Sequence, residues 1–326
     1  MSIRRAVAAA SVAFIATMSA TSAHAYSQVI VFGDSLSDNG NLAQKFGGAV
    51  PAPSVYAPGR FSSGPVAVEV LASTLGIPLV DYAYGGALTG AGNQFQAQNP
   101  LVANTGLQSQ VNKFTTSLSD AGQAADAAAL YVVWGGGNDF LSVIGSGDFS
   151  NINTVLATAV SNLVAEVGTL YAAGARDFLV PLLPDLATTF YGTSGAVPAA
   201  QLSGLTAGFN GLLSSKLKLL KSNSPGLSLN IFNTPSFLAG VRADLAAAGG
   251  NITDRCWTGD YAGQGGTLCA NPDQYYLFDK VHPTAYVHNA VGLAFAAAVP
   301  EPAVSGLALV GVLLAGAVAA RRRPAA

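Results

Sequence analysis

One stretch near the N-terminus constrains the fold most: an apolar run, Val29 to Phe32, is followed at once by Gly33, Asp34 and Ser35. A short apolar run that ends in turn residues is typical of a fully buried strand. Asp and Ser favour turns and helix N-termini. Because open α/β sheets bind ligands at the carboxyl ends of their strands, we expect Ser35 at such an end. Its hydroxyl there is either a nucleophile or an ordinary helix cap.

A nucleophilic serine needs a base, and the chain has three histidines, His24, His282 and His288. His24 lies in a segment that we expect to be removed, and His288 is expected to be a surface or packing residue. Asp279 precedes His282 by one turn, so its carboxylate can hold Nδ1–H while Nε2 faces outward. The chain order therefore predicts a triad of Ser35, His282 and Asp279. The alternative is a surface Asp and His in a loop.

Two glycine-rich turns end other apolar runs. Leu130 to Trp134 is typical of a second buried strand, and it ends in three glycines and Asn138. An Asn amide at a strand end can donate a hydrogen bond to a developing oxyanion. The turn after Tyr82 contains Gly85 and Gly86, and a backbone N–H there can be a second donor, since glycine lets a substrate approach closely. Both stretches are also compatible with ordinary turns.

Taken in chain order, these four sequence stretches resemble the motifs of the GDSL, or SGNH, hydrolase family of esterases and lipases. The matching motifs are Gly-Asp-Ser-Leu around Ser35, Tyr-Gly-Gly-Ala at 84–87, Gly-Gly-Asn-Asp around Asn138, and Asp279 with His282. The stretches 59–65 and 181–186 recur in the lipase-like branch of that family. The resemblance implies an oxyanion hole formed by Ser35, Gly86 and Asn138. Counting from Asp81 favours Gly86 over Gly85 as the glycine donor.

Apolar strands alternate with helices along residues 27–299, which favours a parallel sheet covered by helices on both faces. Strands are expected within 29–32, 78–82, 130–134, 177–183 and 227–232, and the main helices within 64–75, 107–118, 154–173, 199–220, 236–248 and 284–298. We therefore predict one three-layer α/β/α domain with a mainly parallel sheet. The resemblance implies five core strands in a flavodoxin-like order. A G-x-S-x-G motif is absent from the sequence, which disfavours the common α/β-hydrolase fold.

The two ends of the chain differ from this domain in composition. Residues 1–25 hold two arginines, a short apolar run and Ala-His-Ala, the pattern of a secretory signal peptide rather than of a transmembrane anchor. Residues 300–326 begin Pro-Glu-Pro, continue as an apolar run long enough for a transmembrane helix and then hold three consecutive arginines. This order resembles the PEP-CTERM sorting tail of Gram-negative bacteria, which implies removal during export. A permanent anchor is the alternative.

The expected domain, residues 26–299, is then exported to the periplasm, the outer envelope or the medium. In that setting Cys256 and Cys269 predict a disulfide, with two free buried thiols as the alternative. The sequence has neither C-x-x-C nor H-E-x-x-H, so no metal and no cofactor is expected. Residues 26–300 have a formal charge of about −6 and no basic run, which makes nucleic acid and anionic membranes poor partner candidates.

The resemblance implies a secreted serine esterase or lipase that forms an acyl-enzyme on Ser35, with His282 as base and Asp279 orienting it. Its expected partners are a small or lipid-like ester and the export and sorting machinery, with membrane contact only through the tail. The segments 87–105, 142–153 and 187–196 are polar and glycine-rich, which favours a shallow cleft and acyl chains of short or medium length. A carbohydrate acetylesterase and a non-catalytic envelope or matrix protein are the alternatives.

Overall fold

The computed structural model describes residues 26–299. The predicted signal peptide, 1–25, and the predicted sorting tail, 300–326, lie outside the described residues. Both remain predictions.

The central sheet has five strands in the order β2-β1-β3-β4-β5, and every neighbouring pair is parallel. Its strands are β1 (Val29–Gly33), β2 (Leu79–Asp81), β3 (Leu130–Trp134), β4 (Asp177–Pro181) and β5 (Ser228–Phe232). This is the flavodoxin-like order, so the predicted fold class is confirmed. Gly33 is in register with Trp134, which makes β1 and β3 end at the same level. In such a sheet the strand order reverses between these two strands, and ligands bind outside their carboxyl ends.

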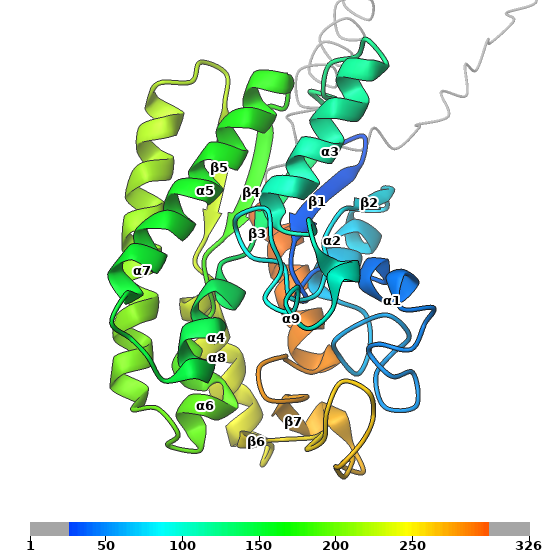
Figure 1. Cartoon of the computed structure of the whole chain (residues 1–326), viewed down its shortest axis with the longest axis vertical. Coiled ribbons are helices and arrows are strands. Elements are labelled where there is room, and N and C mark those ends of the chain that lie inside the picture. The colour runs from blue at the N-terminus through cyan, green and yellow to red at the C-terminus, as the bar shows by residue number, and fades with distance from the viewer. Residues whose placement is uncertain (1–25, 300–326) are drawn as a thin grey trace, which may run out of the picture. The chain divides into compact units, whose positions relative to one another are not determined.

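Helices cover both faces of the sheet (Figure 1). The longer ones are α2 (Ala67–Leu75), α3 (Leu107–Asp120), α4 (Gly137–Ser146), α5 (Ile152–Ala173), α7 (Ala199–Ser222), α8 (Thr234–Ala247) and α9 (Ala285–Ala298). Side chains alternate between the faces of a strand, so Ile30 and Phe32 pack against α3, α5 and α7 in one core. Val29 and Val31 pack against α2, α8 and α9 in the other. These two apolar cores make the three layers.

Shorter elements lie around the carboxyl ends of the strands. They are α1 (Asn41–Lys45), α6 (Phe190–Thr193), the 3-10 turns η1 (Pro100–Val102), η2 (Leu186–Thr188) and η3 (Pro272–Gln274), and the paired strands β6 (Asn251–Arg255) and β7 (Tyr275–Leu277). The sequence predicted a loop over 251–273 and missed β6, because its residues are mostly polar and show no alternation. It also missed α4, whose buried Phe140, Val143 and Ile144 have helical spacing but stand among glycines.

By length and composition alone, α5 is apolar enough to span a membrane. In this fold it packs against α3, α4 and α7 and buries Ala159, Leu163 and Val167. Packing in the core therefore accounts for its apolar face.

Candidate active site

Ser35 lies in a tight turn directly after β1. Gly33 is required before it, because a Cβ there would lie 2.9 Å from the carbonyl oxygen of Trp134. The buried side chain of Gln110 on α3 accepts a hydrogen bond from the Gly33 N–H at 2.9 Å and donates one to the Gly33 carbonyl at 2.8 Å. Asp34 closes the turn by accepting from the Leu36 N–H at 3.0 Å. Asp34 thus has the turn position that the sequence predicted. The sequence did not predict the contact of Gln110 with Gly33.

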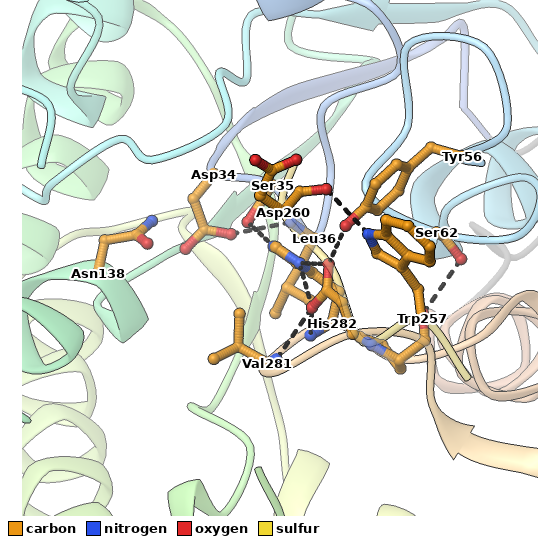
Figure 2. A network of polar contacts seen from close by, with 12 residues as sticks. Asp34, Ser35, Leu36, Tyr56, Ser62, Asn138, Trp257, Asp260, Val281 and His282 are labelled. Carbon is orange, nitrogen blue, oxygen red and sulfur yellow. Dashed lines mark hydrogen bonds and ion pairs between the residues drawn. The ribbon is translucent and has the colours of Figure 1, made fainter. Parts of the chain in front are cut away.

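The three predicted triad residues meet at this turn, and Figure 2 shows Ser35 beside His282. The Ser35 Oγ lies 2.7 Å from His282 Nε2. The other ring nitrogen, Nδ1, lies 2.8 and 2.9 Å from the two carboxylate oxygens of Asp279. All three side chains are buried. The arrangement has the geometry by which a histidine takes a proton from a serine while a carboxylate holds the ring.

A local turn places the Asp279 carboxylate beside Nδ1 of His282. The Phe278 N–H donates to the His282 carbonyl at 2.8 Å, and Asp279 Oδ1 accepts from the backbone N–H groups of Val281 and His282 at 3.0 and 2.9 Å. The Cys256 N–H donates to Leu277 just before this turn. Cys256 and Cys269 form a disulfide, which braces the same region.

Tyr56 is a partner of Asp279 that the sequence did not reveal. Its hydroxyl donates to Asp279 Oδ2 at 2.9 Å, and the residue is buried. Burial and the nearby Asp279 raise the pKa of Tyr56, so the phenol stays protonated and remains a donor. Burial opposes ionisation of Asp279, but His282 and the hydrogen bonds outweigh it and lower the pKa of that carboxyl.

Two aromatic rings pack against His282. The ring centroid of Phe61 lies 5.0 Å and that of Tyr261 5.8 Å from the imidazole. The serines that follow Phe61 hold the loop after His282, because Ser62 donates to the Pro283 carbonyl at 3.1 Å and Ser63 accepts from the Ala285 N–H at 2.9 Å. The stretch 59–65 thus positions the imidazole.

Asn138 is the second residue of α4 and lies on the other side of Ser35, after the three glycines that follow β3 (Figure 2). Its Nδ2 donates to the Ala87 carbonyl at 2.9 Å, and its Oδ1 accepts from Gln94 Nε2 at 2.8 Å. Since the Ala87 oxygen can only accept, these two contacts fix the orientation of the Asn138 amide. The second Nδ2 proton has no acceptor among residues 26–299. Gln94 was not predicted from the sequence.

The two glycines of the 84–87 turn differ in their backbone N–H groups. The Gly85 N–H donates to Asp38 Oδ2 at 2.7 Å, so it is already engaged. The Gly86 N–H has no acceptor among residues 26–299, and Gly86 lines one small pocket with Ser35, Asn138 and His282. Gly86 has a φ of 76°, a conformation that favours glycine. The geometry therefore leaves Gly86, not Gly85, free to donate.

Asp38 holds this turn against α1. Besides Gly85, it accepts from the N–H groups of Gly40 at 2.9 Å and Asn41 at 2.7 Å. The carboxylate thereby caps α1 and anchors the glycine turn beside Ser35. This role of Asp38 was not evident from the sequence.

An apolar cavity adjoins Ser35 and Asn138. Its lining is mainly aliphatic, with Leu36, Leu141, Leu183, Leu186, Leu238, Leu277, Val281, Val287 and Val291. The sequence did not predict this cavity. Of the three polar rim segments, only 187–196 contributes to its wall, through Thr188 and Thr189, and the aliphatic side chains come from elements far apart in the sequence.

His288 and Arg60 have structural roles. His288 is buried in the cavity wall, where Nδ1 accepts from the Ala67 N–H at 3.2 Å. Burial, with a smaller effect of His282, lowers its pKa to about 3, so it stays neutral. Arg60 forms an ion pair with Glu69. Within residues 26–299 no three His, Cys, Asp or Glu side chains gather in a way that could hold a metal ion.

Comparisons with known proteins identify a matching family and several similar chains. The family model described as GDSL-like Lipase/Acylhydrolase matches residues 29–295. The chain is 28% identical to the phosphatidylcholine-sterol acyltransferase of Aeromonas hydrophila, over 76% of this chain and 70% of that protein. It is 30% identical to the esterase EstA of Pseudomonas aeruginosa, over 87% of this chain but only 48% of the relative. Among solved structures, the lipase Lip_vut3 from a goat rumen metagenome has 15% identity and a TM-score of 0.40, covering 83% of this chain and 96% of that one.

Proposed function

Because the chain belongs to the GDSL-like lipase and acylhydrolase family, we propose that it hydrolyses carboxylic esters through an acyl-enzyme on Ser35. The observation that supports this most is the continuous contact from Ser35 Oγ through His282 to Asp279. A serine hydroxyl is a weak nucleophile unless a base takes its proton. His282 is the one imidazole of the described residues within hydrogen-bond distance of that hydroxyl.

In the first half-reaction Ser35 Oγ attacks the ester carbonyl while His282 Nε2 takes its proton. Asp279 stabilises the resulting imidazolium and keeps Nε2 facing the serine. The tetrahedral intermediate collapses as His282 gives the proton to the leaving alcohol, which leaves the acyl group on Ser35. In the second half-reaction His282 takes a proton from water, the hydroxide attacks the acyl carbon, and the proton returns to Ser35.

The negative charge on the carbonyl oxygen needs donors that are in place before the reaction. The proposal assigns this role to the backbone N–H groups of Ser35 and Gly86 and to the Asn138 amide. The free Gly86 N–H and the remaining Nδ2 proton of Asn138 support the assignment. No cofactor or metal enters this mechanism.

The apolar cavity beside Ser35 is the proposed site of the acyl chain. Its aliphatic lining suits a hydrocarbon better than a sugar ring or a charged acid. We expect acyl chains of short or medium length. The cavity lies beside Ser35 within the fold, and none of the described segments is a long amphipathic lid helix.

The test is the kcat/KM of residues 26–299 for p-nitrophenyl esters from acetyl to palmitoyl, with an acetylated polysaccharide in the same panel. A maximum at butyryl to octanoyl supports the proposal, and Ser35→Ala should remove nearly all hydrolysis. Ser119→Ala, a change at an exposed position on α3, is the matched control and should keep full activity.

Other outcomes favour other functions. A maximum at palmitoyl would indicate a long-chain lipase, and activity confined to the polymer would indicate a carbohydrate acetylesterase. A folded protein without hydrolysis of any ester would favour the envelope or matrix-binding alternative.

Export of the domain is a further part of the proposal, supported by the composition of residues 1–25 and 300–326 and by the disulfide. Intact-mass analysis of protein from the native host tests it. The mass should lack residues 1–25 and most of the chain after Pro302. A mass that includes residues 321–323 would refute removal of the tail.

A further inference from the structure

A second hollow, which we call the polar cleft, adjoins the catalytic centre. It shares Gln94, Phe95, Tyr261 and Val281 with the small pocket at Ser35. Its other walls include Tyr191, Arg255, Asp260 and Lys280. With the apolar cavity it shares only Leu141 and Val281. An ester held at Ser35 therefore has an apolar hollow and a polar hollow available for its two halves.

Arg255, at the end of β6, is the unusual residue in this cleft. The carbon of its guanidinium lies 4.1 Å from the ring centroid of Phe190. Its Nε and one terminal nitrogen are buried, and neither has a hydrogen-bond partner within residues 26–299. No described carboxylate pairs with it. A cation that is partly removed from water and lacks a partner is unfavourable, so the site is incomplete as it stands.

Neither of the two carboxylates that line the cleft, Asp279 and Asp260, pairs with the Arg255 guanidinium. The oxygens of Asp279 are engaged by His282 and Tyr56. Asp260 accepts from the N–H groups of Ala262 at 3.0 Å and Gln264 at 2.7 Å. Lys280 adds a second positive charge on an exposed side chain. The cleft thus holds two cations and two carboxylates, and Arg255 is the cation whose buried donors lack a partner among residues 26–299.

We propose that the polar cleft binds an anionic group, a carboxylate or a phosphate, on the alcohol part of the ester, with Arg255 as its main partner. A guanidinium can donate a charge-assisted hydrogen bond to either group, and Lys280 adds charge. The inference rests on the proposed ester hydrolysis, since it takes the acyl carbon to be at Ser35. The acyl chain then occupies the apolar cavity and the leaving alcohol occupies the cleft. Arg255 determines specificity and takes no part in bond breaking.

The experiment compares butyrate esters that differ in the charge of the alcohol part. 4-Acetylphenyl butyrate is the neutral ester, and 4-(butyryloxy)benzoate and 4-(butyryloxy)phenyl phosphate are the anionic ones. In Arg255→Gln the ratio of kcat/KM, anionic over neutral, should fall by about tenfold to a hundredfold, the range for one hydrogen bond between charged groups. Arg255→Lys should retain part of the ratio, and Lys280→Gln should lower it less.

Lys218→Gln is the matched control, since it removes the same charge from an exposed position on α7 and should leave the ratio unchanged. The two anionic esters separate carboxylate from phosphate recognition. An unchanged ratio in Arg255→Gln would overturn the inference. An equal fall in kcat/KM for the neutral and anionic esters also leaves the ratio unchanged, and it is the result of a purely structural role.

A binding measurement keeps this inference separate from the proposed hydrolysis. The affinity of Ser35→Ala for each intact ester is measured by calorimetry, with and without Arg255→Gln. Weaker binding of the anionic esters alone would support the cleft even if no ester were hydrolysed. Equal affinities would overturn it. Should Arg255→Gln fail to fold, Arg255→Lys and Lys280→Gln provide the same comparison.

Discussion

The Tyr56 hydroxyl donates to Asp279 Oδ2 across 2.9 Å, although 223 positions separate the two residues. With His282 on the same carboxylate and two backbone N–H groups on Oδ1, the lone pairs of Asp279 are engaged on every side. These contacts keep a buried carboxylate ionised and fix its orientation. The orientation of His282 toward Ser35 therefore depends on a residue outside the family motifs.

Tyr56→Phe keeps the ring and removes this donor. We expect kcat for p-nitrophenyl butyrate to fall by about tenfold or more with little change in KM, the effect of one hydrogen bond to a charged group. Tyr171→Phe is the control, since its hydroxyl donates to the Pro225 carbonyl at the surface. Equal kcat in the wild type and in Tyr56→Phe would reduce Tyr56 to a packing residue.

Asn138→Ala should lower kcat by about 10²–10³, by analogy with other side-chain oxyanion donors. Gln94→Met should have a smaller effect, since Gln94 acts only by orienting the Asn138 amide. The combined variant should be no worse than Asn138→Ala alone, because Gln94 has nothing left to position. Gln108→Met, at an exposed position on α3, is the control. Additive losses in the double variant would contradict this account of Gln94.

Replacing Cys256 and Cys269 together by serine opens a loop that closes over 13 positions. The free energy of unfolding should fall by about 3 kcal/mol in the chain-entropy model. Urea denaturation with and without reductant measures the loss, and the double variant should not respond to the reductant. The loop includes Trp257 and Tyr261, so the polar cleft should unfold at a lower urea concentration than the central sheet. Unchanged wild-type stability in reductant would contradict the prediction.

Five buried carboxyls predict how stability depends on pH. Burial raises the pKa of Asp34, Asp38 and Asp139 to about 6, against an ordinary value of 3.8, and raises the pKa of Asp81 and of Glu166 well above their ordinary values. Between these values the folded state binds more protons than the unfolded state, so the free energy of unfolding falls as the pH rises. His288, whose pKa burial lowers to about 3, contributes the opposite slope over this range, but it is one group against five. The lowered pKa of Asp279 contributes that slope only at more acidic pH.

Urea denaturation at pH 5 and pH 7 should therefore give the greater free energy of unfolding at pH 5, by about 1–3 kcal/mol. Asp139→Asn should make the dependence less steep, because it removes one of the five groups. A free energy of unfolding that rises from pH 5 to pH 7 in the wild type would contradict the burial argument.

The sheet and the residues at its edge could be predicted because their signals are local. The uniformly apolar runs of β1 and β3 end in Gly33 and in the glycines before Asn138, and parallel strands bring such ends together. The spacing of Asp279 and His282 is that of a single turn. The resemblance to a known family then supplied their order and roles.

The residues that support the site could not be found in this way. Tyr56, Gln94 and Gln110 act through contacts that the fold creates between distant segments, and each stands in a stretch without a distinctive pattern. The apolar cavity has the same origin, since its walls come from several helices and loops. The helix α4 was missed because glycines on either side concealed three apolar residues with helical spacing.

The central claim is that His282 and Asp279 activate Ser35 as a nucleophile. A fluorophosphonate probe tests it directly, because it forms a bond only with an activated serine. Incubation of residues 26–299 with the probe, followed by peptide mass analysis, should place one adduct on Ser35. The adduct should be lost in His282→Ala and kept in Ser119→Ala. A folded protein that remains unlabelled, or one labelled at another serine, would contradict the account.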